Sequence, residues 1–183
     1  MANYTVSLSK QLSALTGKEI LLIMIETKKY QNTYPLIIKK VTQRKSDRGI
    51  YVSFNKSHSE IKLVLKKAKT GPERFYIIDT IGKSNKNDKE GCCLAGPESL
   101  TQLSIILTQL MKTRKYTCLF FDNLSSFLIY HDLETTERFI HYLVGKLQFY
   151  GMRGIFLSLN DKKSKDLVEV ISPFFDRRID LTK

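Results

Sequence analysis

The sequence has few cysteines, and those it has are placed where they exclude the usual cysteine chemistry. There are three, Cys92, Cys93 and Cys118. None stands in a Cys-x-x-Cys spacing or beside a matching pair of histidines, so a zinc site is not expected. The sequence instead predicts free, largely buried thiols in a reducing compartment.

Long hydrophobic runs are also missing. A run such as Ile20–Ile25 is far shorter than the roughly 18 apolar residues that a membrane-spanning helix needs. Residues 1–10 are polar and lack the apolar stretch of a secretory signal. We therefore expect a soluble, cytoplasmic protein.

Signatures of nucleophilic catalysis are absent too. The three histidines, His58, His131 and His141, are scattered, with no serine, cysteine or aspartate at a recognisable catalytic spacing. The Gly-x-Ser-x-Gly pattern of hydrolases does not occur. The sequence thus predicts no catalytic residue and no metal.

What is present is the composition of one folded domain. The 183 residues are 42% hydrophobic and 26% charged, close to the globular average. We find no internal repeat or low-complexity block, and we interpret the polar stretch Gly82–Gly91 as a surface insertion. Residues 1–183 are therefore predicted to form a single domain.

Positive charge is concentrated in one early segment. The formal net charge is +12, and residues 28–69 carry twelve Lys or Arg against Asp47 and Glu60, which is +10 of that total. Such a segment can attract nucleic acid, acidic proteins or anionic lipid. It is equally compatible with a lysine-rich solvated surface.

Short apolar runs alternate with longer amphipathic stretches along the chain. The expected strands are 20–25, 50–54, 75–78, 92–94, 118–121, 154–159 and 177–181. The expected helices are 7–15, 35–44 with Pro35 in its first turn, one capped by Ser57 or Ser59 that runs to about 69, 97–111, one capped by Asp132 and closed by Gly151, and 163–171. Strands separated by helices pair in parallel, so the fold class is α/β, with a mostly parallel central sheet and helices on both faces. Ligands of such folds bind beyond the carboxyl ends of the strands.

Five of these segments, in this order and spacing, resemble the RecA/KaiC superfamily of ATPases. They are Gly49–Phe54, Phe75–Asp79, Leu119–Ser125, Gly154–Leu159 and Phe175–Leu181. The resemblance covers about residues 20–181 and implies a RecA-like fold. It also implies that Asp122 stands where the family places its Mg²⁺-associated aspartate at the end of the Walker B strand.

Two departures from the family predict that ATP is not hydrolysed. The phosphate loop, Gly-x-x-x-x-Gly-Lys-[Ser/Thr], needs glycines so that backbone N–H groups can cradle phosphates. The junction Glu26–Pro35 contains no glycine, and Pro35 has no N–H. KaiC-like ATPases resemble one another in placing acidic residues after the second strand, where this chain has Asn55 and Lys56. Neither ATP nor Mg²⁺ is therefore expected as a cofactor.

Asp122 has two interpretations. It could be a residual contact for a nucleotide or cation, or it could cap the turn after its strand beside Asn123 and Ser125. We favour the second, because one carboxylate without a phosphate loop holds Mg²⁺ poorly.

Three functions follow. The leading hypothesis is a non-catalytic RecA/KaiC-like domain that binds or regulates a protein partner or an active paralogue, with homo-oligomers also compatible. An alternative is a nucleic-acid-binding protein that uses segment 28–69, with Tyr30, Tyr34 and Tyr51 stacking on bases. Its candidate nucleic-acid or anion contacts are Lys28, Lys29, Lys39, Lys40, Arg44 and Lys45. A third is an unorthodox nucleotide-binding ATPase in which Lys28 and Lys29 meet the phosphates.

Overall fold

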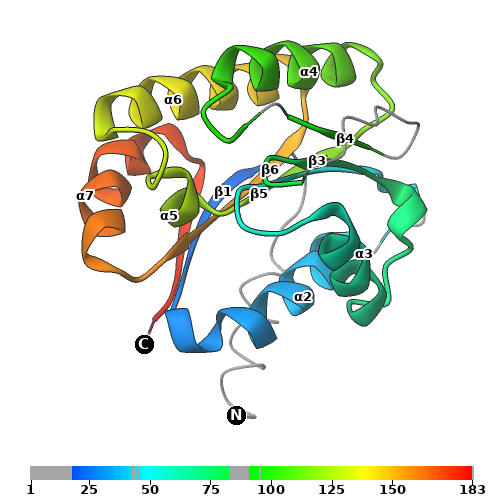
Figure 1. The fold of residues 1–183 in the computed structure, drawn as a ribbon, viewed down its shortest axis with the longest axis horizontal. Helices are drawn as coiled ribbons and strands as arrows, with labels where there is room; N and C mark the ends of the chain where they lie inside the picture. The colour runs from blue at the N-terminus through cyan, green and yellow to red at the C-terminus, as the bar shows by residue number, and fades with distance from the viewer. Residues whose placement is uncertain (1–17, 43, 45, 83–90, 95, 183) are drawn as a thin grey trace.

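A seven-stranded parallel sheet forms the centre of the molecule in the computed structural model, which describes residues 18–42, 44, 46–82, 91–94 and 96–182 (Figure 1). The strands are β1 Ile20–Ile25, β2 Gly49–Ser53, β3 Phe75–Asp79, β4 Gly91–Cys93, β5 Cys118–Asp122, β6 Arg153–Leu159 and β7 Arg177–Leu181. They lie in the order β4-β3-β2-β5-β6-β1-β7, and each neighbouring pair is parallel. The predicted α/β fold with a parallel sheet is confirmed.

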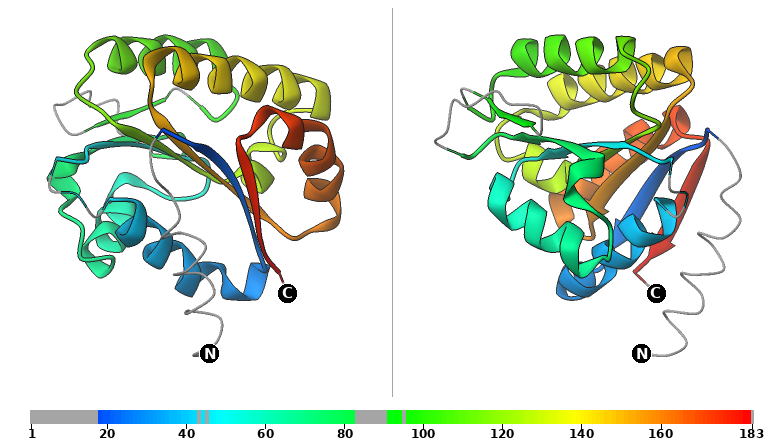
Figure 2. Two further views of the ribbon diagram at one scale, coloured as in Figure 1. Left: turned by 180° about the vertical axis from the view of Figure 1, so that it is seen from behind. Right: turned by 90° about the vertical axis from the view of Figure 1, so that its right-hand side faces the viewer.

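Helices cover both faces of this sheet. Figures 1 and 2 show α2 Tyr30–Val41 and α3 His58–Lys67 on one face. On the other face lie α4 Leu100–Lys112, α5 Leu124–Phe127, α6 Leu133–Tyr150 and α7 Lys162–Ile171. The described residues also form the 3₁₀ turns η1 Thr27–Lys29, η2 Pro72–Arg74 and η3 Ser172–Phe174.

Strand β1 shows why its run of six apolar residues is needed. Ile20, Leu22 and Met24 belong to the core beneath α4, α6 and α7. The alternate residues of the strand belong to the opposite core, beneath α2 and α3. Successive side chains of a strand point to opposite faces, so a strand covered on both sides is apolar throughout.

Helix α2 differs from its predicted bounds of 35–44. It begins at Tyr30 and ends at Val41, which places Pro35 in the second turn rather than the first. Its buried residues are Tyr30, Thr33, Tyr34, Ile37, Ile38 and Val41, a continuous 3.6-residue period. Burial of that face, which includes Tyr30 and Tyr34, stabilises the helix by more than the backbone hydrogen bond lost at Pro35 costs.

The predicted starts of two other helices are confirmed by their caps, and of the two candidates for α3 the cap is Ser57. Ser57 and Glu60 form a capping box at the start of α3. Asp132 accepts a hydrogen bond from the Thr135 N–H at the start of α6, and Gly151 ends that helix at φ 65°. Helix α4, by contrast, begins at Leu100 and not at Pro97.

Several predictions lie wholly or partly outside the described residues. These are the helix 7–15, most of the insertion after Gly82, and Lys45. Cys92 and Cys118 are buried thiols outside any disulfide, as predicted, and burial raises the pKa of the Cys118 thiol to about 12. Among the described residues, no helix combines the length and the apolar character that crossing a membrane requires.

Candidate functional site

The carboxyl edge of the sheet, where the parallel strands end, brings three polar side chains side by side. In the strand register Ser53 of β2 lies between Asp79 of β3 and Asp122 of β5. The Asp79 carboxylate accepts hydrogen bonds from the backbone N–H groups of His58, Ile81 and Gly82, so it stabilises the adjoining loops. Asp122 is the member that reaches toward other side chains.

Asp122 is almost fully buried, with 1% of its surface exposed, yet both of its carboxylate oxygens are occupied. The Tyr30 hydroxyl donates to Oδ1. The Tyr51 hydroxyl donates to Oδ2 over 2.5 Å, and the Lys56 ammonium donates to the same oxygen over 2.9 Å. We call these four residues, Tyr30, Tyr51, Lys56 and Asp122, the Asp122 cluster.

The Lys56 ammonium is the positive centre of this cluster. Its three N–H groups find three acceptors, the Tyr30 hydroxyl at 2.5 Å, Asp122 Oδ2 at 2.9 Å and Asn55 Oδ1 at 3.1 Å. It also lies over the rings of Tyr30 and Tyr34, 4.6 and 4.8 Å from their centroids. A lysine that is only 7% exposed is therefore fully hydrogen-bonded and paired with a carboxylate.

The tyrosines of the cluster are neutral and act as hydrogen-bond donors. Burial, reinforced by the nearby Asp122 carboxylate, raises the pKa of Tyr30 and of Tyr51 well above the ordinary value for the phenol. Burial also raises the pKa of Tyr34, whose ring stacks on that of Tyr30 with 4.9 Å between the two centroids. At physiological pH these hydroxyls stay neutral, so Tyr30 and Tyr51 donate to Asp122 rather than repel it.

The junction between β1 and α2 is short and closed. Strand β1 ends at Ile25, the 3₁₀ turn Thr27–Lys29 follows, and α2 starts at Tyr30. The backbone N–H of Lys29 donates to the backbone carbonyl of Glu26 over 2.8 Å, and the side chains of the same two residues form an ion pair. A phosphate loop of eight residues does not fit into this interval of four, and the first turn of α2 places Tyr30 against Asp122 instead.

The prediction that Asp122 caps the turn after its strand is wrong, because a neighbouring residue has this role. The cap of the turn after β5 is Asn123, whose Oδ1 accepts from the Ser126 N–H at 2.8 Å and opens the short helix α5. Asp122 points the other way, into the Asp122 cluster. The expectation that Tyr30, Tyr34 and Tyr51 stack on bases was also wrong, since all three are at most 5% exposed.

The candidate basic contacts do not form one patch. Lys28, which is exposed, and Lys29 lie at the start of α2, beside the carboxyl edge. Lys39 and Lys40 lie in the last turn of that helix, and the exposed Arg44 follows it at the opposite edge. Twelve helical residues rise by roughly 18 Å, which separates the two groups.

Sequence reasoning missed the lysine that matters most. The sequence presents Lys56 only as a residue that stands where the family has an acid, although it follows the apolar strand β2 closely, with Phe54 and Asn55 between, where a buried charged residue has to find a partner. Its partner, Asp122, is 66 positions away. Among the described residues, no group of three or more His, Cys, Asp or Glu is arranged to hold a metal ion.

The parallel sheet with helices on both faces is that of a RecA/KaiC-like α/β fold. Among solved structures, this fold is shared by the KaiC-like protein PH0186 from the hyperthermophilic archaeon Pyrococcus horikoshii OT3. The TM-score is 0.64 at 11% sequence identity, over 90% of this chain and 71% of that one. The similarity establishes the fold alone.

Family membership comes from the sequence. Residues 40–181 match the Family of unknown function (DUF7504), and the chain belongs to that family. No curated protein matches the chain.

Proposed function

We propose that this protein is a non-catalytic RecA/KaiC-like domain that works as a binding or regulatory module, through a protein partner or an active paralogue. The observation that carries the proposal is the Asp122 cluster. The Lys56 ammonium and two tyrosine hydroxyls occupy both carboxylate oxygens of Asp122, which leaves neither oxygen without a partner for a metal ion.

The closed junction after β1 supports the same proposal. The junction has no glycine, and only four residues lie between β1 and α2, so the glycine-rich turn that aims a row of backbone N–H groups at phosphates is missing. Asn55 and Lys56, at the end of β2, offer no carboxylate to activate water. The residues present therefore do not fit ATP and Mg²⁺ in the manner of the family.

The test is ATP hydrolysis together with ATP calorimetry in the presence of Mg²⁺. We expect the wild-type chain to release no phosphate above the background of a mock purification. Asp122→Asn serves as the comparison, because it keeps the shape of the side chain and removes its charge. Hydrolysis by the wild type that Asp122→Asn abolishes would overturn the proposal and favour the unorthodox ATPase.

Nucleic-acid binding is the second candidate, favoured by the exposed cations Lys28, Lys39 and Arg44 in the segment that holds most of the net charge. It predicts affinity for single-stranded DNA that falls steeply with salt. Lys39→Glu with Lys40→Glu should then lower the slope of log affinity against log salt by about two. The matched control reverses Lys162 and Lys163, exposed lysines in the first turn of α7. Equal slopes in both variants would exclude this surface.

A further inference from the structure

The edge of the sheet opposite the Asp122 cluster carries a pocket of about 410 Å³. Its walls come from the segments that lead into four neighbouring strands, β2, β5, β6 and β1. The volume lies in the range of sites for small ligands. We call it the amino-edge pocket.

Cations dominate its polar lining. Lys18, Arg44, Arg114 and Arg153 contribute four positive charges, and Asp47 contributes one negative charge. The Asp47 carboxylate is already neutralised, since Oδ1 pairs with Arg153 at 2.6 Å and Oδ2 accepts from the Arg44 backbone N–H at 3.0 Å. A surplus of three positive charges remains to face the pocket.

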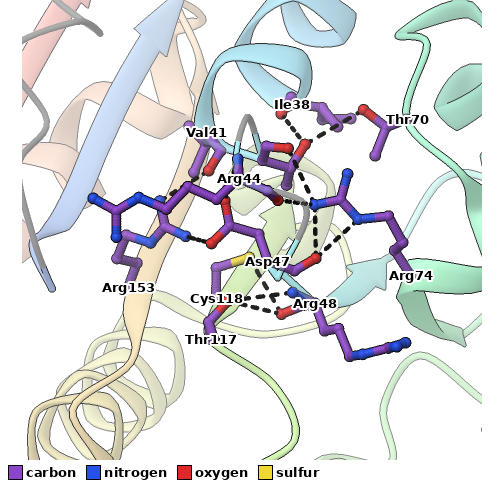
Figure 3. Close-up of polar contacts among 11 residues, drawn as sticks. Ile38, Val41, Arg44, Asp47, Arg48, Thr70, Arg74, Thr117, Cys118 and Arg153 are labelled. Atoms are coloured by element: carbon purple, nitrogen blue, oxygen red, sulfur yellow. Dashed lines mark hydrogen bonds and ion pairs between the residues drawn. The ribbon is translucent and has the colours of Figure 1, made fainter.

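Stabilisation of helix ends does not account for this surplus. Helices α2, α4 and α6 end at this edge, where basic residues commonly offset the carbonyl groups of a last turn. Two arginines already do so around α2 (Figure 3). Arg153 donates to the Val41 carbonyl at 2.8 Å, and Arg74 donates to the carbonyls of Thr42, Arg44 and Asp47.

The other three cations are uncommitted. Within the described ranges, the side chains of Lys18, Arg44 and Arg114 donate no hydrogen bond and form no ion pair, and all three residues are exposed. They come from positions far apart in the sequence, and all three line this pocket. Guanidinium and ammonium side chains that line one hollow suit an anion with several oxygens, such as a phosphate.

The rest of the wall suits an organic part of the ligand. Two half-buried tyrosines, Tyr116 and Tyr150, line the pocket together with Met111 and Met152. Aromatic faces and thioethers contact flat or apolar groups well. We propose that the amino-edge pocket binds a small molecule that carries a phosphate group on a flat or apolar body, independently of the Asp122 cluster.

Arg114 allows a test that leaves the fold intact. Its backbone has a φ of 52°, a conformation that glycine adopts more readily than other residues. Arg114→Gly therefore removes a cation from the pocket without straining the backbone. Lys69→Gly is a matched control, because Lys69 is an exposed lysine with a φ of 55° at the end of a different helix, outside the pocket.

The probes are adenosine 5′-monophosphate, inorganic phosphate and adenosine, titrated into the full chain by calorimetry. We expect the monophosphate to bind with one site per chain, more tightly than inorganic phosphate, while adenosine stays below detection. Arg114→Gly should weaken binding by about tenfold or more, the effect of losing one charged hydrogen bond, and Lys69→Gly should leave it unchanged.

Three results would overturn the proposal. The first is no binding of either phosphate probe at millimolar concentration, and the second is equal affinity in the wild type and Arg114→Gly. The third is binding only to single-stranded DNA, with affinity that grows with length, which indicates an extended surface instead of a pocket. ATP binding that Arg114→Gly removes and Asp122→Asn preserves would support the pocket and leave the proposed function standing. The reverse pattern would count against the proposed function, because it would place the nucleotide at the Asp122 cluster.

Discussion

The two edges of the same sheet differ in how their charges are satisfied. At the carboxyl edge, Lys56 and Asp122 are buried together and every N–H of the ammonium has an acceptor inside the protein. At the amino edge, Arg153 and Asp47 form a comparable pair, but Lys18, Arg44 and Arg114 around them have no such partners within the described residues. The usual ligand edge of a parallel α/β fold is thus filled by the chain itself, while the usually structural edge is open and positively charged.

This comparison shows that a fold does not decide where its ligand binds. Position in the sheet makes the carboxyl edge available, but side chains determine whether it stays open. In this chain the first turn of α2 and the side chain of Lys56 close the carboxyl edge.

The largest effect is expected from breaking the closed edge. Lys56→Met leaves the Asp122 carboxylate buried without its cation, so the free energy of unfolding should fall by about 3–5 kcal/mol. Urea denaturation measures it, with Lys66→Met, an exposed lysine of α3, as the control. The double variant with Asp122→Asn should recover part of the loss. A loss of less than about 1 kcal/mol for Lys56→Met would mean that the charge is not truly desolvated.

The corresponding change at the open edge should cost less. Arg153→Met removes the partner of Asp47, whose carboxylate keeps the hydrogen bond from the Arg44 N–H. We expect a loss of about 2–3 kcal/mol, below that of Lys56→Met, because some compensation remains. The same urea series tests it. If Arg153→Met were the more damaging of the two, the contrast between the edges would be reversed.

Alkaline pH should weaken the closed edge selectively. The pKa of Tyr30 and of Tyr51 is higher in the folded protein than the ordinary 10.0, so the folded state holds these protons while the unfolded chain releases them. Their contribution is complete below pH 10 and is lost as pH rises further, by about 1.4 kcal/mol per pH unit for each tyrosine. Unfolding free energies of the wild type and Tyr51→Phe at pH 9–11 should therefore converge. Parallel curves would contradict the assignment.

The smallest effect concerns the rim of the amino-edge pocket. Gly151→Ala places a side chain at φ 65°, where its Cβ would lie 2.9 Å from Lys18 Nζ. We expect a loss of about 1–2 kcal/mol from the left-handed backbone, together with weaker phosphate binding as Lys18 is displaced. Gly145→Ala, which adds a Cβ to open space within α6, should instead be neutral or slightly stabilising. Thermal unfolding of the two variants compares them directly.

Much of the fold could be predicted from local patterns. The apolar runs Ile20–Ile25 and Cys118–Asp122 are strands covered on both faces, and the caps at Ser57 and Asp132 begin helices as their residue types indicate. Helix α2 was predicted too short, because Pro35 was taken as a start signal and the tyrosines before it were not counted as part of its buried face.

The positions of the strands and the lack of glycine after β1 can be read from the amino-acid sequence alone, because hydrophobic period and backbone freedom are local properties. The sequence did not determine what fills the space above Asp122. Lys56, Tyr30 and Asp122 meet only because β2 pairs with β5 and α2 begins over their ends, and the amino-edge pocket collects Lys18, Arg44 and Arg114 in the same way. Tertiary packing decides which charges that are distant in the chain become partners. Their interaction is strong in the protein interior, because the effective dielectric constant there is lower than in water.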